Sequence, residues 1–379
     1  LAAAFLMSGF FAPQQAFAAA TVTSASGGTN ISIDTTSAGG TGAYKPLSGP
    51  GINELVAGDI SAGVHTITLP AGWEFEISTI SIFTFGSDIV FESTSITPSP
   101  TSFSFNVTAQ STTGGFVGFG GLKVRPTGTT PSTSNMTYSG VGIVGVSGST
   151  NFGTLSTVAG TVTKLAFTTE PGGAVYGSLL SPQPVVKTQD QFGNDSTNGS
   201  SGKTATLTLT GAGTLLGTFA LDISSGTATF ADLAVYEVGA GKILIATADG
   251  LTPADSSSFE VTQKPLTATV TANDKTYDGN STAVVTATDI SLGLVYGDVV
   301  TADTGTSTTF SDENAGTGKT VTATGITLSG VKATNYSFDG TGTGTADINQ
   351  LVITVTPTVG QTKVYGSTDP VFTYDFTPA

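Results

Sequence analysis

Short runs in which threonine alternates with an apolar residue recur along the chain and constrain its fold strongly. In the run TATLTLT, residues 204–210, Ala205, Leu207 and Leu209 share one parity. A β-strand sends successive side chains to opposite faces, so such a run buries one face and exposes the other. Glycine, asparagine, aspartate and proline separate the runs, and no stretch keeps a helical period. The pattern predicts an all-β chain.

The charge balance excludes several classes of partner. Charged residues are only 10% of the chain, against roughly 25% in an average soluble domain. Twelve basic and 27 acidic residues give a net charge of −15. Binding to nucleic acid or to an anionic membrane surface requires clustered lysine and arginine, so neither is expected. The chain has no cysteine, which rules out disulfides and thiol chemistry within it.

The first twenty residues have the features of a signal peptide. An apolar run, LAAAFLMSGFFA, is followed by Ala16-Phe17-Ala18, a small-x-small cleavage box. The run is too short to span a bilayer. We therefore predict that residues 1–18 are a signal peptide whose basic start is missing from this sequence. Export places the protein outside the cell or on the bacterial cell surface, with no membrane span in this fragment.

The spacing of the alternating runs divides the mature chain into parts of domain size. Strands at short regular intervals with turn signals between them suggest β-sandwiches. We predict tandem Ig-like β-sandwich domains with the boundaries 19–160, 161–262, 263–349 and 350–379, the last being the start of a truncated domain. The run LTATVT, residues 266–271, is mirrored by LVITVT, residues 351–356. The inward positions predicted for these two runs are Leu266, Ala268 and Val270, and Leu351, Ile353 and Val355.

A repeated word follows each of these two runs. KTYDGN spans residues 275–280, and KVYG spans residues 363–366. A motif that recurs at the same place in successive domains is expected to be a structural corner between strands rather than a binding site. Gly279 would supply a positive φ, and the Tyr277 ring would lie on the edge of the core with its hydroxyl on a backbone partner. Lys275 would extend over that ring.

Longer words give resemblances to known families. KTYDGN, DENAGTGKTVTATGITLSG and GVKATNYSF make the third part similar to the YDG domain of bacterial haemagglutinin-type surface proteins. KVYGSTDPVFTY resembles the start of an MBG domain, a bacterial Ig-like fold. QPVVKTQDQFGND and SGTATFADLAV resemble the Ig-like repeats of invasin-type proteins. ITLPAGWEF and NFGTL in the first part are similar to the N-terminal β-domains that precede such repeats.

The sequence shows little catalytic potential. His65, the only histidine, shares its face with Ile67 and Leu69 and is expected to be packed in a strand. Glu74 and Glu76 share a strand face, where two solvated carboxylates need no function. Neither a nucleophile elbow nor a zinc ligand set is present. We predict that the chain is not an enzyme and needs no cofactor.

Calcium is the one ion with candidate ligands. Asp190, Asn194 and Asp195 lie in the turn DQFGND and offer hard oxygen ligands. The stretch SDEN offers Asp312, Glu313 and Asn314. The same residue types are ordinary turn formers, and no EF-hand spacing accompanies them, so these remain weak candidates.

The resemblances imply a long modular surface or secreted protein for which adhesion is the usual role. We predict a non-catalytic exported stalk or adhesin fragment, whose partner is an unknown host or cell-surface receptor or glycan. One alternative is a carbohydrate-binding module with Trp73 as a stacking platform, although Trp73 shares its face with Phe75 and Ile77 and is expected in the core. The other alternative is a set of accessory domains of an exported enzyme whose catalytic domain lies beyond residue 379.

Overall fold

The computed structural model describes residues 18–38 and 42–377. The predicted signal peptide, residues 1–18, lies outside this range except for Ala18. The described chain consists of strands and turns with three short 3-10 helices, which confirms the all-β prediction. No helix in the described residues is long and apolar enough to cross a membrane.

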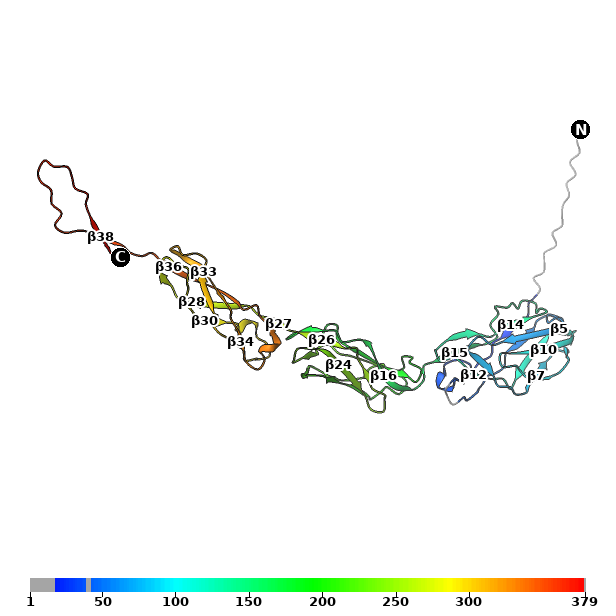
Figure 1. The fold of residues 1–379 in the computed structure, drawn as a ribbon. Helices are drawn as coiled ribbons and strands as arrows, with labels where there is room; N and C mark the ends of the chain where they lie inside the picture. The colour runs from blue at the N-terminus through cyan, green and yellow to red at the C-terminus, as the bar shows by residue number, and fades with distance from the viewer. Residues whose placement is uncertain (1–17, 39–41, 378–379) are drawn as a thin grey trace, which may run out of the picture.

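The strands form four successive groups, which we call units 1 to 4. Within the described residues, no sheet contains strands of two groups. Figure 1 shows the units in a row, so that units 1 and 4 lie at opposite ends of an elongated molecule. The tandem β-sandwich prediction is therefore confirmed.

Unit 1 packs a five-stranded sheet, order β1-β4-β11-β7-β9, against a four-stranded sheet, order β14-β5-β10-β8. Phe119 of the first sheet lies 5.1 Å from Phe103 and 5.0 Å from Phe105 of the second, measured between ring centroids. These rings form the centre of the unit's core. The elements are β1 (Thr21–Thr23), β2 (Ile31–Ser32), η1 (Ile33–Thr35), β3 (Lys45–Pro46), β4 (Gly51–Glu54), β5 (Gly63–Thr68), β6 (Trp73–Phe75), β7 (Ile80–Phe85), β8 (Val90–Phe91), β9 (Ser95–Ile96), β10 (Ser102–Ala109), β11 (Gly115–Gly120), β12 (Lys123–Pro126), β13 (Thr133–Asn135), β14 (Thr137–Gly140) and β15 (Thr154–Val158).

Unit 2 pairs a three-stranded sheet, order β16-β18-β22, with a larger sheet, order β17-β26-β24-β19-β21. Ala205 and Leu207 of β19 are buried as the alternation predicts, and Leu209 is partly buried. The elements are β16 (Val162–Thr169), β17 (Ala174–Val175), β18 (Val185–Asp190), β19 (Thr204–Thr210), β20 (Leu215–Leu216), β21 (Ala220–Asp222), β22 (Thr227–Thr229), β23 (Ala234–Val235), β24 (Gly239–Thr247), β25 (Ala254–Asp255) and β26 (Phe259–Thr262).

Unit 3 is built on a sheet of order β30-β28-β36-β33-β32. Leu266, Ala268 and Val270 are buried, as predicted. The elements are β27 (Lys264–Pro265), β28 (Ala268–Ala272), β29 (Lys275–Thr276), β30 (Val285–Asp289), η2 (Ser291–Gly293), β31 (Thr301–Ala302), β32 (Ser307–Phe310), β33 (Gly316–Thr324), β34 (Leu328–Ser329), η3 (Ala333–Asn335), β35 (Tyr336–Ser337) and β36 (Thr341–Asn349).

Unit 4 is a single hairpin of β37 (Thr354–Pro357) and β38 (Tyr374–Thr377). The prediction that Leu351, Ile353 and Val355 point into a core is wrong for this structure, where they are 38%, 57% and 52% exposed. Two strands make only one layer, and an apolar face is buried only when a second layer covers it.

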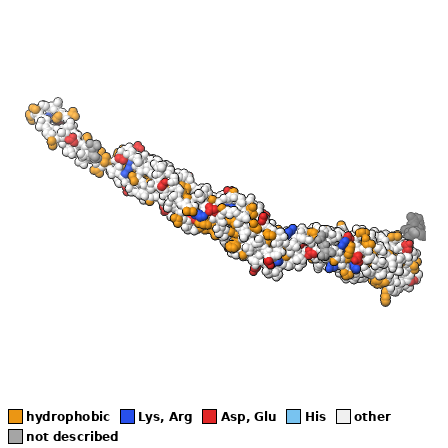
Figure 2. All heavy atoms as spheres, turned by 60° about the horizontal axis from the view of Figure 1, so that its bottom comes forward, with side chains coloured by type: hydrophobic (Ala, Val, Ile, Leu, Met, Phe, Trp, Pro, Cys, Tyr) orange, Lys and Arg blue, Asp and Glu red, His pale blue; other side chains and the backbone are white. Residues whose placement is uncertain are grey.

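The molecular surface is mostly uncharged. In the view of Figure 2, scattered acidic and basic side chains interrupt a face of uncharged polar side chains and backbone, and apolar side chains are spread along the molecule, most densely over its middle. The composition accounts for this appearance, because threonine, serine and glycine provide the surface that lysine and glutamate cover in an average protein.

Candidate functional site

The carboxylate of Asp298 is the centre of the contact between units 2 and 3. Asp298 belongs to unit 3, follows η2 and is 8% exposed. Its Oδ2 accepts hydrogen bonds of 2.9 Å from the Tyr176 hydroxyl and 2.8 Å from the Tyr336 hydroxyl. Its Oδ1 accepts one of 2.6 Å from the Tyr236 hydroxyl. Two of the three donors, Tyr176 and Tyr236, come from unit 2, so the carboxylate joins the units directly.

A fourth tyrosine closes the site. The Tyr296 ring meets the Tyr176 ring edge-on at 5.5 Å and the Tyr236 ring at 5.3 Å between centroids. Edge-to-face packing is a favoured arrangement for aromatic rings. We call Asp298 and these four tyrosines, Tyr176, Tyr236, Tyr296 and Tyr336, the tyrosine cluster.

The ionisation of the cluster follows from its hydrogen bonds. Burial raises the pKa of Asp298, but the hydroxyls of Tyr236, Tyr336 and Tyr176 outweigh it and hold that pKa below its ordinary value. Burial and the bond to Asp298 raise the pKa of Tyr176. Burial raises the pKa of Tyr336 to about 12. One anion with three neutral hydroxyl donors is therefore the stable state at neutral pH.

An ion pair lies at the rim of the cluster. Lys332 of unit 3 places its Nζ 2.7 Å from a carboxylate oxygen of Glu237 in unit 2. The same Nζ lies 4.3 Å from the centroid of the Tyr236 ring. The hydrogen bond to Glu237 raises the pKa of Lys332, so the lysine is positively charged across the physiological range.

Backbone geometry brings Tyr176 into this position. Its amide donates a 2.9 Å hydrogen bond to the carbonyl of Thr262, at the end of unit 2. Gly177 follows with φ +87°, and a Cβ at that position would lie 2.8 Å from a methyl carbon of Val295 in unit 3. Only glycine combines this backbone conformation with so close an approach.

The apolar cores of units 2 and 3 are continuous. One cluster of buried side chains contains Leu244 and Val261 of unit 2 together with Val270 and Ile326 of unit 3, and Tyr176 and Tyr336 belong to it. Independent domains with small polar interfaces move relative to each other by default. A shared core prevents that motion, because separating the units would expose apolar side chains and leave Asp298 without its donors.

Two carboxylates hold the linker between units 1 and 2. Asp34 of unit 1 accepts a 2.8 Å hydrogen bond from the amide of Thr161. Asp190 of unit 2 accepts one of 2.9 Å from the amide of Gly160. A Cβ on Gly160 would lie 2.1 Å from Oδ1 of Asp34, so a side chain at residue 160 would displace the carboxylate that binds the Thr161 amide.

Of the calcium candidates of unit 2, Asp190 takes part in this linker contact. Asp190 is fully buried, and its oxygens accept hydrogen bonds from the amides of Gly160, Phe192 and Asn194 and from the Asn194 side chain. Burial raises the pKa of Asp190, but these donors outweigh it and lower the pKa overall. Asp195 pairs instead with Lys187 at 2.6 Å.

Calcium binding at this turn stays a prediction. The structure brings Asp190 and Asn194 together, with an Asn194 amide hydrogen bond 3.1 Å long to Oδ2. An ion would have to replace N–H donors at Asp190. Within the described range, no group of three or more histidine, cysteine, aspartate or glutamate side chains is arranged to hold a metal.

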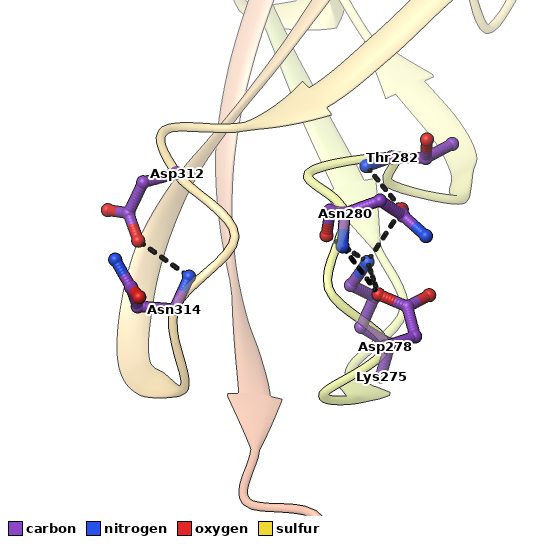
Figure 3. Close-up of polar contacts among 6 residues, drawn as sticks. All are labelled: Lys275, Asp278, Asn280, Thr282, Asp312 and Asn314. Atoms are coloured by element: carbon purple, nitrogen blue, oxygen red, sulfur yellow. Dashed lines mark hydrogen bonds and ion pairs between the residues drawn. The ribbon is translucent and has the colours of Figure 1, made fainter.

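The KTYDGN word forms a loop organised by a lysine. Figure 3 shows the Lys275 ammonium directed at the oxygens of the turn that follows it. Its Nζ lies 2.7 Å from Oδ1 of Asp278, 2.6 Å from the carbonyl of Asn280 and 3.1 Å from the Asn280 side-chain oxygen. Asn280 in turn accepts a 3.0 Å hydrogen bond from the amide of Thr282. The KTYDGN segment is therefore a structural turn in which three oxygens converge on the ammonium group of Lys275.

The detail predicted for Lys275 and Tyr277 is wrong in two respects. Lys275 lies 5.7 Å from the centroid of the Phe310 ring rather than over Tyr277. The Tyr277 ring is 38% exposed, and its hydroxyl forms no hydrogen bond with the residues that the structure describes. The oxygens of Asp278 and Asn280 attract the ammonium more strongly than a ring does, which draws Lys275 away. Gly279 has φ +76°, as predicted.

The calcium candidates of unit 3 also form local turn bonds. Oδ1 of Asp312 accepts a 2.8 Å hydrogen bond from the amide of Asn314, which Figure 3 shows, and pairs with Lys319. Glu313 stands between Asp312 and Asn314 in the sequence, and its side chain is exposed. The hydrogen bond from Lys319 lowers the pKa of Asp312.

The remaining candidates have structural contacts. His65 is fully buried, stacks on Phe105 at 4.9 Å and bonds to the Tyr138 hydroxyl and the Ser61 carbonyl. Glu76 pairs with Lys123 at 2.7 Å, and Glu74 pairs with Arg125. The carboxylates of Glu74, in β6, and Glu76, just after it, are thus divided between two cations and offer no acid–base dyad.

Trp73, the candidate sugar platform, is 3% exposed in the core of unit 1. The core position that the alternation predicts is confirmed, and a buried ring provides no stacking surface for a sugar. The tyrosine cluster was not found from the sequence, although one signal was available. The dipeptide Tyr-Gly recurs at residues 176–177, 296–297 and 365–366.

Comparison with known families identifies one part of the chain. The third part forms unit 3, with its lysine-centred loop and its sheet. Residues 262–346 match the YDG domain family. The resemblance based on the words KTYDGN and GVKATNYSF is thereby confirmed, and unit 3 is the YDG domain below. Among curated proteins, none matches this chain.

Solved structures of modular surface proteins are similar in part. FdeC, an adhesin of Escherichia coli, has a TM-score of 0.30 at 10% identity over 86% of this chain and 96% of that chain. Invasin, a bacterial integrin-binding protein, has a TM-score of 0.27 at 14% identity over 89% of this chain and 61% of that chain. The adhesin domain of Epf from Streptococcus pyogenes has a TM-score of 0.17 at 10% identity over 57% of this chain and 72% of that chain. These TM-scores are too low for the function of the neighbours to be inferred for this chain.

Proposed function

We propose that this chain is a non-enzymatic stalk segment of an exported, adhesin-type bacterial surface protein. Its β units hold a binding part away from the cell. The observation that carries the proposal is the tyrosine cluster, in which Asp298 of the YDG domain is buried among hydroxyls from both units. A chain of independently mobile modules has no need to bury a carboxylate at a joint.

Rigid joints suit a stalk for a physical reason. The end-to-end distance of a flexible chain grows only as the square root of its length. Units that are locked end to end add their full lengths instead. The shared core of units 2 and 3 and the linker held by Asp34 and Asp190 both favour this extended arrangement, which Figure 1 shows.

The surface composition and the YDG match support an extracellular location. Only 12 lysines and arginines occur in 379 residues, which leaves few sites for trypsin-like proteases. The YDG resemblance implies a haemagglutinin-type surface protein, and the predicted signal peptide implies export. The partner that we propose is a host or cell-surface receptor or glycan contacted by another part of the protein.

The rigidity of the joint can be measured by electron spin resonance between two labels. Because the chain has no cysteine, Thr208→Cys in unit 2 and Ser307→Cys in the YDG domain introduce the only labelling sites. Both positions are exposed. We expect a narrow distance distribution in this labelled chain and a broad one after Asp298→Ala is added.

A matched control separates the joint from general effects. Asp249→Ala removes an exposed carboxylate of unit 2 and is expected to leave the distribution narrow. A broad distribution in the chain that retains Asp298 would contradict the stalk proposal.

A further inference from the structure

The far end of the YDG domain repeats the construction of the far end of unit 2. In unit 2, β17 pairs in parallel with the last strand β26, and the amide of Tyr176 donates 2.9 Å to the carbonyl of Thr262. In the YDG domain, β29 pairs in parallel with the last strand β36, and the amide of Tyr277 donates 2.8 Å to the carbonyl of Asn349. Tyr277 therefore occupies the position that Tyr176 occupies at the joint.

A second strand repeats independently. β24 reads GAGKILIAT and β33 reads GTGKTVTAT, so both carry the pattern Gly-x-Gly-Lys-x-x-x-Ala-Thr. Their registers shift at the same place, between Gly239 and Lys242 in one strand and between Gly316 and Lys319 in the other. The residues just before each strand therefore correspond.

This correspondence identifies the residues around Tyr277. The three residues before β24 are Tyr236, Glu237 and Val238, and each of them contacts the YDG domain through its hydroxyl, its carboxylate or its amide. The three residues before β33 are Glu313, Asn314 and Ala315. The structure has a groove at this end of the YDG domain, lined by Tyr277, Asn314, Ala315, Gln350, Leu351 and Ile353.

The two ends differ in what covers them. Tyr176 is fully buried under the YDG domain, whereas Tyr277 is 38% exposed. The groove beside Tyr277 continues into Leu351 and Ile353, which lead directly into unit 4. The segment next to the uncovered face is thus unit 4 itself.

The hairpin of unit 4 repeats the first hairpin of the YDG domain. Thr269, Val270 and Thr271 of β28 pair with β30, and Thr354, Val355 and Thr356 of β37 pair with β38 in the same antiparallel order. In the YDG domain, the chain after β30 carries Asp298 to the tyrosine cluster. The corresponding segment of unit 4 would follow β38.

We propose that the end face around Tyr277 is the docking site for unit 4, completed to a full β-domain by the segment that follows β38. The occupant presents a hydrogen-bond acceptor to the Tyr277 hydroxyl, as Asp298 does for Tyr176. This inference rests on the stalk proposal, because it extends the same joint by one unit.

The test is nitration of tyrosines by tetranitromethane, followed by mass spectrometry. It compares the 379-residue chain with the same chain extended through the completed fourth domain, as its natural gene encodes it. Tyr277 is expected to react in the shorter chain and to fall at least tenfold in reactivity in the longer one. Tyr365 corresponds to Tyr277 at the far end of unit 4 and is fully exposed, so it should react in the shorter chain and in an extension that stops at the fourth domain.

The nitration experiment distinguishes failure of the docking inference from failure of the stalk proposal. Unchanged reactivity of Tyr277 in the longer chain, or a natural gene that does not complete the hairpin to a domain, would overturn the docking inference. Tyr176 should stay unreactive in both chains, and its modification would overturn the stalk proposal instead.

Discussion

The hydroxyl of Tyr176 donates a 2.9 Å hydrogen bond to the carboxylate of Asp298, 122 residues later and in the next β unit. Both residues are buried. The bond joins the adjoining ends of units 2 and 3. Tyr236 and Tyr336 donate the other two hydrogen bonds to the same carboxylate. A joint of this kind restricts the motion of the two sandwiches relative to each other.

Removing the carboxylate should weaken the joint. Asp298→Ala leaves the hydroxyls of Tyr176, Tyr236 and Tyr336 without their acceptor, and unsatisfied buried donors cost about 1–3 kcal/mol each. Because water enters such a joint, we expect a total loss of about 3 kcal/mol in the free energy of unfolding, measured by urea denaturation. Asp249→Ala should change it by less than about 0.5 kcal/mol. An equal effect of both substitutions would contradict the role given to Asp298.

The joint should weaken in acid and in strong alkali. The folded pKa of Asp298 is lowered, so its contribution is present above about pH 4, the unfolded value, and is lost as the pH falls through the folded pKa. The pKa of Tyr336 is raised to about 12, so its contribution is present below about pH 10 and is lost as the pH rises through the folded value. Melting temperatures of the wild type and Asp298→Asn, compared from pH 2 to pH 8, should converge at the acid end. A constant difference would refute this account.

Glycine at position 177 should be required by two separate constraints. Gly177→Ala adds a Cβ that would lie 2.8 Å from Val295, at a backbone φ of +87°. Gly241→Ala has a similar φ of +71° but meets nothing within 4 Å. We expect a loss of about 1 kcal/mol for Gly241→Ala from strain alone, and a loss about 2 kcal/mol greater for Gly177→Ala. Equal losses in chemical denaturation would show that Val295 yields at no cost.

The lysine-centred loop should act locally. Lys275→Met keeps the length of the side chain but removes the ammonium that three oxygens of Asp278 and Asn280 share. We expect faster hydrogen exchange of the amides of Asn280 and Thr282, which bond to those same side chains. The amide of Tyr176, which lies in unit 2 at the joint with the opposite end of the YDG domain, serves as the internal control and should exchange as before. Faster exchange at Tyr176 would contradict a local role.

Burial patterns within single strands were predictable because they depend on short-range alternation. Ala205 and Leu207 are inside as expected, and so is Val270. The alternation failed at Leu351 and Ile353, which need a second layer that the described residues of unit 4 do not provide. Local pattern states which face of a strand is apolar, but only the packing of layers states whether that face is covered.

The contacts of polar groups were less predictable than the strands. Asp190 was a weak calcium candidate from its turn, and the structure shows that its carboxylate also accepts the amide of Gly160 from the preceding linker. Lys275 was expected over Tyr277, yet the oxygens of its own turn hold it. Each choice depends on which donor or acceptor lies nearest in space, and that information is absent from the order of residues.

The order of residues by itself determined the all-β architecture, the scaffold role of KTYDGN and the match of residues 262–346 to the YDG domain. These properties depend on alternation, turn chemistry and contiguous words. Only the tertiary structure decided that Tyr176 and Tyr236 meet Asp298, and that Tyr277 occupies the equivalent but uncovered place. Hydrogen bonds between units depend on how two sandwiches are seated end to end, and that seating results from packing across more than a hundred residues of chain.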